Sequence, residues 1–202
     1  MRSRAAAAVL SREGFNQAYS MDGGIRAWNG LRAAGPPEAG MAYFEPAQKP
    51  EEMIALACIL EEGACKFYWE MGKRQKGPDE AALFQELSDD EEKHKSSLFN
   101  IYQTRAGKDA DPGFPRSLLS LESGVDYLEG GVVLNQALEW AQGKELKDIL
   151  DFSISLEVNA IDLYIKMERK VEGGEAKEVF QALSNQERNH LKRLTTGLQK
   201  DW

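Results

Sequence analysis

The sequence predicts an all-α chain whose main part is a four-helix bundle made of two helix pairs. Three observations predict it: a long stretch repeats itself, apolar residues recur at steps of three and four, and glycine-containing turns separate the periodic segments. Matching residues lie 96 positions apart, as from 61 to 157 and from 94 to 190. Two helix-turn-helix units of one design account for all three observations.

Composition sets the first limits on function. The chain has 202 residues with 33 acidic and 25 basic side chains and a net charge of −8, which argues against a nucleic-acid-binding surface. The hydrophobic share of 42% is typical of a folded chain. The apolar run Ala5–Leu10 is far shorter than the roughly 20 residues of a membrane span, and Ser11–Glu13 ends it too early for a signal peptide. We therefore expect a cytoplasmic protein that binds no membrane.

The chain divides near residue 40. Residues 35–49 form a linker rich in glycine and proline. The segment 1–34 before it predicts four short elements, in order a helix, a strand, a turn and a helix: Arg2–Glu13, Gln17–Ser20, Asp22–Gly24 and Ile25–Ala34. That segment is too small to close a core alone, whereas residues 50–202 are long enough for a complete domain.

Helix periodicity continues through both copies of the repeat. Leu60–Met71 aligns with Leu156–Met167, and Phe84–Ser88 aligns with Phe180–Ser184. Pro50 suits the first turn of a helix, while Gly77-Pro78 and Gly173-Gly174 suit turns between paired helices. We expect four long helices, near 51–75, 78–106, 145–171 and 175–200. The crossover Gly107–Lys144 is long enough to run from one end of the bundle to the other, with a short helix at Val132–Ala141.

The repeat also separates candidate metal ligands from other polar residues. Three pairs keep their chemistry in both copies: Glu61/Glu157, Glu91/Glu187 and His94/His190. The two histidines are the only ones in the chain, and each follows a glutamate by three residues, which places both side chains on one helix face. Four ionised glutamates in a bundle core need compensating charge, and two bound cations would supply it.

Two other interpretations of these residues stay open. A lone Glu-x-x-His pair on a helix is usually a solvated ion pair, although its occurrence in both copies favours metal ligation. Tyr68 and Tyr164 lie seven residues after Glu61 and Glu157, two turns along the same face. They are either hydrogen-bond donors to the carboxylates or plain aromatic core.

The two cysteines predict no metal or disulfide chemistry. Cys58 and Cys65 are seven residues apart on one helix, about 10 Å, which is beyond disulfide reach. The chain has no Cys-x-x-Cys pair, and the repeat aligns both thiols with isoleucines, Ile154 and Ile161. We expect both to be small apolar core residues.

With these ligands, residues 50–202 resemble a rubrerythrin-type ferritin-like di-iron domain. The resemblance implies that Glu91 and Glu187 bridge two irons, and that the terminal ligands come from the remaining four residues: Glu61, Glu157, His94 and His190. Oxygen and imidazole donors suit iron, with manganese as the alternative.

Two departures from that family affect the expected activity. Rubrerythrin carries a rubredoxin domain with four cysteines, which is not found here, so electrons would come from an external rubredoxin-like protein or reductase. Rubrerythrin also has an extra glutamate one turn after the third-helix ligand, where this chain has Ala160. A ligand shift that depends on such a glutamate is not expected at that position.

The first residues resemble a different family. Arg2–Ala7, Gly14-Phe15 and Tyr19–Trp28 are similar to the last third of a rhodanese domain. In that family the sulfur-carrying cysteine precedes the helix that starts here, so it would fall upstream of Met1. We expect no rhodanese activity from these 202 residues, whether the segment is a truncation or a docking appendage.

Three functions are consistent with the sequence. The first is a non-haem di-iron oxidoreductase, expected as a homodimer, that reduces hydrogen peroxide or dioxygen with Glu61, Glu91, His94, Glu157, Glu187 and His190 at the catalytic centre. The second is a ferroxidase or iron-handling protein without peroxidase turnover. The third is a metal-stapled interaction module linked to a sulfurtransferase.

Overall fold

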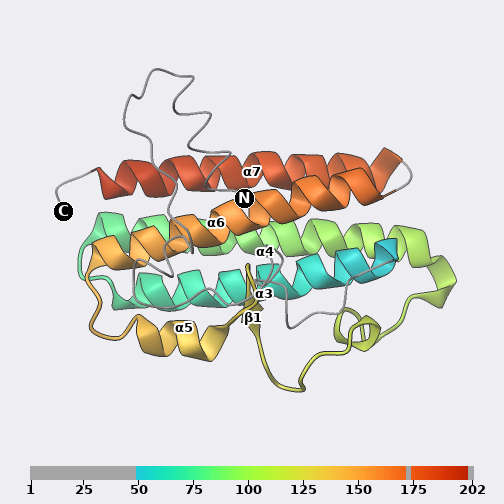
Figure 1. Cartoon of the computed structure of the whole chain (residues 1–202), viewed down its shortest axis with the longest axis horizontal. Helices are drawn as coiled ribbons and strands as arrows, with labels where there is room; N and C mark the ends of the chain where they lie inside the picture. The colour runs from blue at the N-terminus through green and yellow to red at the C-terminus, as the bar shows by residue number, and fades with distance from the viewer. Residues whose placement is uncertain (1–48, 172–173, 200–202) are drawn as a thin grey trace, which may run out of the picture. The chain divides into compact units, whose positions relative to one another are not determined.

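Four long helices dominate the part of the chain that the computed structural model describes, residues 49–171 and 174–199. They are α3 (Pro50–Arg74), α4 (Pro78–Ala106), α6 (Leu146–Lys170) and α7 (Gly174–Leu198). Helix α3 packs along α4, α6 packs along α7, and α4 also contacts α7 (Figure 1). This confirms the expected helical bundle of two pairs. The elements predicted for 1–34 and the linker up to residue 48 lie outside the described residues.

The helix ends follow from local sequence. Pro50 occupies the first turn of α3, and the carboxylate of Glu52 accepts a hydrogen bond from the backbone N–H of Lys49 at 3.2 Å. Pro78 likewise opens α4 directly after Gly77. Helix α4 ends at Gly107, whose φ of 56° is in the left-handed region that glycine tolerates best.

The crossover contains a hairpin that the sequence analysis did not predict. After two short 3₁₀ turns, η2 (Gly107–Asp109) and η3 (Arg116–Leu118), the strands β1 (Tyr127–Leu128) and β2 (Val132–Val133) pair antiparallel. Gly130 and Gly131, with φ of 78° and 75°, allow the chain to reverse between the strands. Helix α5 (Leu134–Trp140) therefore starts two residues later than the expected Val132, because Val132 and Val133 belong to the strand.

This hairpin lies against the middle of the bundle (Figure 1). A Cβ atom added at Gly63 of α3 would lie 2.0 Å from the backbone oxygen of Tyr127, so only glycine allows this approach. On the other side, a Cβ atom at Gly130 would lie 2.6 Å from the side-chain nitrogen of Asn159 in α6. Gly63 and Asn159 are equivalent positions of the repeat, 96 residues apart. The hairpin is therefore held between the two halves.

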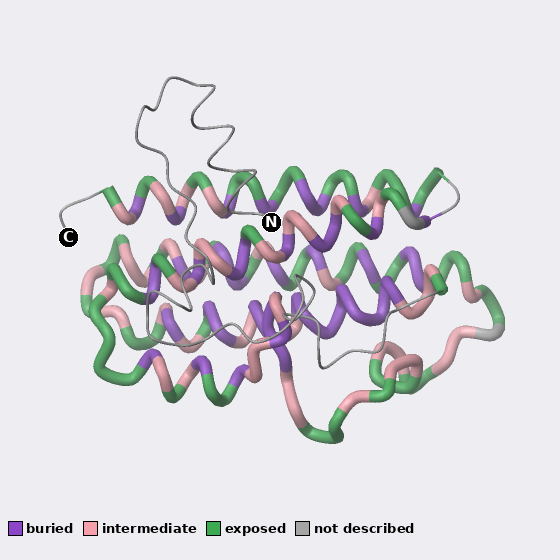
Figure 2. Tube along the Cα trace, in the orientation of Figure 1, coloured by how far each residue is buried: buried purple, intermediate pink, exposed green. Residues whose placement is uncertain are grey.

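Buried and exposed positions alternate along each long helix (Figure 2). The buried ones face the interior of the bundle and form the core. The repeat is visible in its aromatic contacts. Tyr68 stacks on Phe84 with ring centroids 6.2 Å apart, and Tyr164 stacks on Phe180 at 6.1 Å. Within the described residues, no helix is long and apolar enough to cross a membrane.

We predict that Gly63→Ala destabilises the protein by about 1–3 kcal/mol, because the added methyl group overlaps the hairpin backbone. Chemical unfolding followed by circular dichroism measures this. Gly72→Ala is the matched control, since its Cβ atom would meet nothing closer than 3.4 Å. This control should be neutral or stabilising by up to about 1 kcal/mol through helix propensity. Equal stability of the two variants would contradict the prediction.

Candidate metal centre

The structure brings all six predicted ligands together in the middle of the bundle. Each is at least 97% buried, and they come from all four long helices: Glu61 from α3, Glu91 and His94 from α4, Glu157 from α6, and Glu187 and His190 from α7. Their positions follow from the helix periodicity, since each Glu-x-x-His step spans about one turn. The polar groups that the repeat preserves thus meet inside an otherwise apolar core.

The donor atoms form two groups of four that share two carboxylates. Glu91 and Glu187 belong to both groups. Glu61 and His94 complete the first group, and Glu157 and His190 complete the second, with the donor atoms of each group within 4.8 Å of one another. Two four-donor groups with two common carboxylates match the arrangement expected for a pair of neighbouring metal ions.

Each histidine faces three carboxylates through the same ring nitrogen. Nδ1 of His94 lies 2.8, 3.1 and 3.3 Å from the oxygens of Glu91, Glu187 and Glu61. Nδ1 of His190 lies 2.9, 3.2 and 3.4 Å from the oxygens of Glu187, Glu91 and Glu157. The two rings stack with centroids 5.2 Å apart and planes 16° from parallel. Each imidazole thus presents one nitrogen to one group of donors.

Burial and mutual repulsion distort the acid–base properties of the cluster. Burial, followed by the charge of Glu91, raises the pKa of Glu61 to about 7. Burial and Glu187 raise the pKa of Glu157 well above its usual range. Burial and the charge of Glu187 also act against ionisation of Glu91, but its close contacts with the His190 and His94 rings bring its pKa below the ordinary value. Contacts with three carboxylates outweigh burial and raise the pKa of His190 to about 12.

Several of these buried atoms form no well-directed hydrogen bond, although they lie 2.8–3.4 Å from oppositely charged atoms of the same cluster. They are Oε2 of Glu91, both carboxylate oxygens of Glu187, and Nδ1 of His190. Buried polar atoms without well-directed hydrogen bonds are costly in free energy, and here all of them face the centre of the cluster as potential metal donors. Carboxylate oxygens and imidazole nitrogens are donors that iron and manganese accept. The residues therefore fit a pair of such ions.

The two predicted tyrosines contact the carboxylates in a crossed pattern. The Tyr68 hydroxyl on α3 donates to Glu157 on α6, and the Tyr164 hydroxyl on α6 donates to Glu61 on α3. Both tyrosines are fully buried. Each hydrogen bond therefore links one half of the bundle to the terminal carboxylate of the other half, and fixes the orientation of that carboxylate.

One polar contact of the histidines was not found by comparing the repeats. Oδ2 of Asp90 lies 3.5 Å from Nε2 of His190, and Arg193 donates to the same oxygen at 2.6 Å. A carboxylate at the outer nitrogen of a ligating histidine fixes its ring orientation. The equivalent residue in the second copy is Gln186, so Asp90 has no matching acid there.

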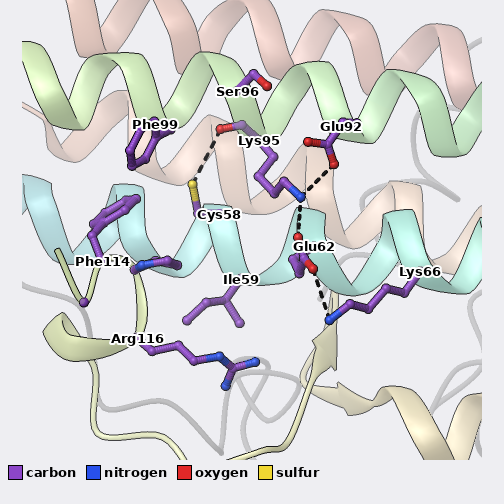
Figure 3. A pocket seen from close by; sticks show the side chains of 12 residues that line it. Cys58, Ile59, Glu62, Lys66, Glu92, Lys95, Ser96, Phe99, Phe114 and Arg116 are labelled. Atoms are coloured by element: carbon purple, nitrogen blue, oxygen red, sulfur yellow. Dashed lines mark hydrogen bonds and ion pairs between the residues drawn. The ribbon is translucent and has the colours of Figure 1, made fainter.

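Neither cysteine belongs to the two donor groups. No disulfide joins them, and Cys58 is buried while Cys65 is partly exposed beside Ser88. Burial and then Glu61 raise the pKa of Cys58 to about 12, so the thiol stays protonated. Cys58 lines a pocket of about 480 Å³ between α3, α4 and Phe114–Arg116, where the Lys95 ammonium lies between Glu62 and Glu92 (Figure 3). None of the six cluster residues lines this pocket.

Comparison with known proteins agrees with the donor cluster. The rubrerythrin family model matches residues 52–129 and 148–201, which together contain all six donors. The chain belongs to the rubrerythrin family. Comparison with curated proteins gives no match. The rhodanese-like segment expected at 1–34 lies outside the matched residues and stays a prediction.

Three solved structures share the fold of this rubrerythrin-family chain. A hypothetical protein from Pyrococcus furiosus is 24% identical, with a TM-score of 0.57 over 81% of this chain and 94% of its own. A putative ferritin-like diiron-carboxylate protein from Thermotoga maritima is 21% identical, with a TM-score of 0.59 over 76% and 97%. KatB, a manganese catalase from Anabaena PCC7120, is 13% identical, with a TM-score of 0.54 over 79% of each chain. The family and the buried cluster together indicate a two-metal site.

We predict that metal binding releases protons and strengthens as the pH rises from about 6 to 8. The reason is that Glu61, Glu157 and both histidines have raised pKa values and must lose their protons to bind a cation. Calorimetric titration of the metal-free protein with Mn²⁺ in buffers of different ionisation enthalpy counts the protons. A binding heat that is the same in all buffers would contradict this.

We also predict that substituting a ligand shared by both donor groups removes more metal than substituting a ligand of one group. Glu187→Gln should weaken binding of both ions, because both donor groups contain Glu187, whereas Glu61→Gln should mainly affect one. Metal content per chain after equilibration with iron under anaerobic conditions measures this. Glu86→Gln, at an exposed position of α4, is the control and should bind as wild type does. Equal losses in the Glu187 and Glu61 variants would disprove the sharing.

Proposed function

We propose that this chain is a non-haem di-iron oxidoreductase that reduces hydrogen peroxide or dioxygen. The observation that carries the proposal is the pair of four-donor groups with Glu91 and Glu187 in common, in a chain of the rubrerythrin family. Iron is the proposed metal, and manganese is the alternative that the same donors accept. An internal electron-transfer site of the Cys-x-x-Cys type is not encoded in these residues.

The surroundings of the centre favour a small oxidant. All six donors are at most 3% exposed, so a bulky organic substrate has no direct contact with them. Peroxide and dioxygen are small enough to reach such a centre through fluctuations of side chains. This supports oxygen-derived substrates over larger molecules.

The residues of the chain have distinct roles in this proposal. Glu91 and Glu187, which belong to both donor groups, would hold both ions, and His94 and His190 would each hold one of them. Tyr68 and Tyr164 hold the terminal carboxylates in place through their hydroxyl protons. When bound, two ferrous ions supply one electron each and stabilise negative charge on oxygen as Lewis acids. Reduction of one peroxide to two waters consumes both electrons and two protons.

Repeated turnover then requires electrons from outside the domain. A rubredoxin-like protein or a reductase is the proposed donor, in agreement with the absence of a Cys-x-x-Cys motif in the sequence. We propose a homodimer as the working form.

The test of this proposal is the oxidation of the anaerobically reduced, iron-loaded protein by stoichiometric peroxide in stopped flow. We expect wild type to oxidise at least 100-fold faster than Glu61→Ala or His190→Ala, because each variant loses a donor from one group. Cys65→Ser, which changes no donor, is the control and should oxidise at the wild-type rate. Variant rates equal to that of wild type would disprove the catalytic role of the cluster.

Stoichiometry separates this function from iron handling. With a chemical reductant and excess peroxide, an oxidoreductase consumes many equivalents of peroxide per chain. A ferroxidase without peroxidase turnover consumes iron in proportion to oxidant and stops when its sites are filled. Less than about one metal per chain after anaerobic loading would reject both and leave the interaction module.

A further inference from the structure

A fifth buried glutamate lies outside the set that the repeat predicts. Glu129 is 4% exposed and follows β1 directly, at the start of the turn of the β1–β2 hairpin. Its Oε2 has no hydrogen-bond partner, and its own backbone N–H is a donor to the carboxylate. Among the described residues no lysine, arginine or histidine forms an ion pair with it. A buried carboxylate without a cation is unstable unless something else compensates its charge.

The hairpin fixes where this carboxylate lies. Tyr127, two residues before it, touches Gly63 of α3, and Gly130, directly after it, touches Asn159 of α6. Gly63 and Asn159 each lie two residues after a terminal donor, Glu61 and Glu157. Glu129 is therefore held between α3 and α6, within about one helical turn of two donors along the chain, and the β1–β2 hairpin meets the middle of the bundle in Figure 1.

The charges that act on Glu129 also indicate that it lies near the metal donors. After burial, the carboxylates of Glu61 and Glu91 contribute most to raising its pKa well above the ordinary value, and Glu157 contributes as well. Glu129 in turn acts on the hydroxyls of Tyr68 and Tyr164. These groups come from α3, α4 and α6 and surround the centre. The unpartnered oxygen of Glu129 thus belongs to the electrostatic environment of the metal donors, not to a separate surface network.

We infer that Glu129 is a fifth carboxylate of the metal centre, which the hairpin holds beside the ions and which favours their more highly charged, oxidised state. The inference rests on the proposed two-metal site. Charge counting gives its physical reason. Four glutamates carry −4, which two divalent ions cancel (+4 − 4 = 0), whereas two trivalent ions leave an excess (+6 − 4 = +2). Glu129 lowers that excess to +1, so its carboxylate stabilises the oxidised pair more than the reduced pair.

The experiment compares Glu129→Gln with wild type and with Glu122→Gln, an exposed residue of the same crossover. Each full chain is loaded with iron, and the midpoint potential of the centre is measured in a mediated titration followed by its absorbance. We expect the Glu129→Gln centre to lose at least tenfold in its affinity for a ferric ion relative to a ferrous ion. For each one-electron step, that loss moves the midpoint potential by about 59 mV toward positive values. Glu122→Gln should match wild type.

Thermal unfolding of the metal-free proteins separates this role from a structural one. Removing a carboxylate that three others (Glu61, Glu91 and Glu157) repel should leave the melting temperature of Glu129→Gln equal to that of wild type or higher. A lower melting temperature, or an unchanged potential, would overturn the inference. If Glu129→Gln does not fold, Glu129→Met removes the charge with a side chain of similar length, and an unchanged potential in that folded variant would overturn the inference as well.

The same measurements distinguish a failure of the proposed function from a failure of the role inferred for Glu129. Wild-type protein that binds no iron would reject the proposed function and this inference together. Wild-type protein that binds two ions with the same potential as Glu129→Gln would reject only the role of Glu129.

Discussion

The structure depends on one electrostatic constraint, the placement of four carboxylates and two imidazoles in the middle of an apolar bundle. The six groups are at most 3% exposed, and four of their atoms form no well-directed hydrogen bond. Repulsion and loss of hydration would drive the helices apart unless protons or cations compensate the charge. The surrounding core of stacked aromatic rings and aliphatic side chains holds these groups in contact and keeps water away from them.

The internal repeat predicted the fold and the donors because both copies must build the same interior. Residues that keep their chemistry at a spacing of 96, such as Glu61/Glu157 and His94/His190, are the ones that meet in the core. The same comparison could not find Asp90, whose equivalent is Gln186. It could not find Glu129 either, because a residue of the crossover has no equivalent in the other copy.

Other features depend on tertiary contacts that no local pattern specifies. Spacing placed Tyr68 and Tyr164 on the faces of Glu61 and Glu157, but only the tertiary arrangement of the two helix pairs determines that each hydroxyl reaches the carboxylate of the other half. The β1–β2 hairpin escaped prediction because strands of two residues are too short to show alternation. In the sequence, Gly63 only weakens a helix. Its reason is the close approach of the Tyr127 backbone, which the sequence does not show.

The crossed tyrosine contacts bear on the origin of the domain. Each helix pair supplies the hydroxyl that orients the carboxylate of the other pair, so neither pair completes its own coordination environment. A single helix pair could therefore have formed such a centre only by associating with a second copy of itself. Gene duplication and fusion of that ancestral homodimer would then free the linking segment to diverge, and the crossover with its hairpin is where this chain has no internal counterpart.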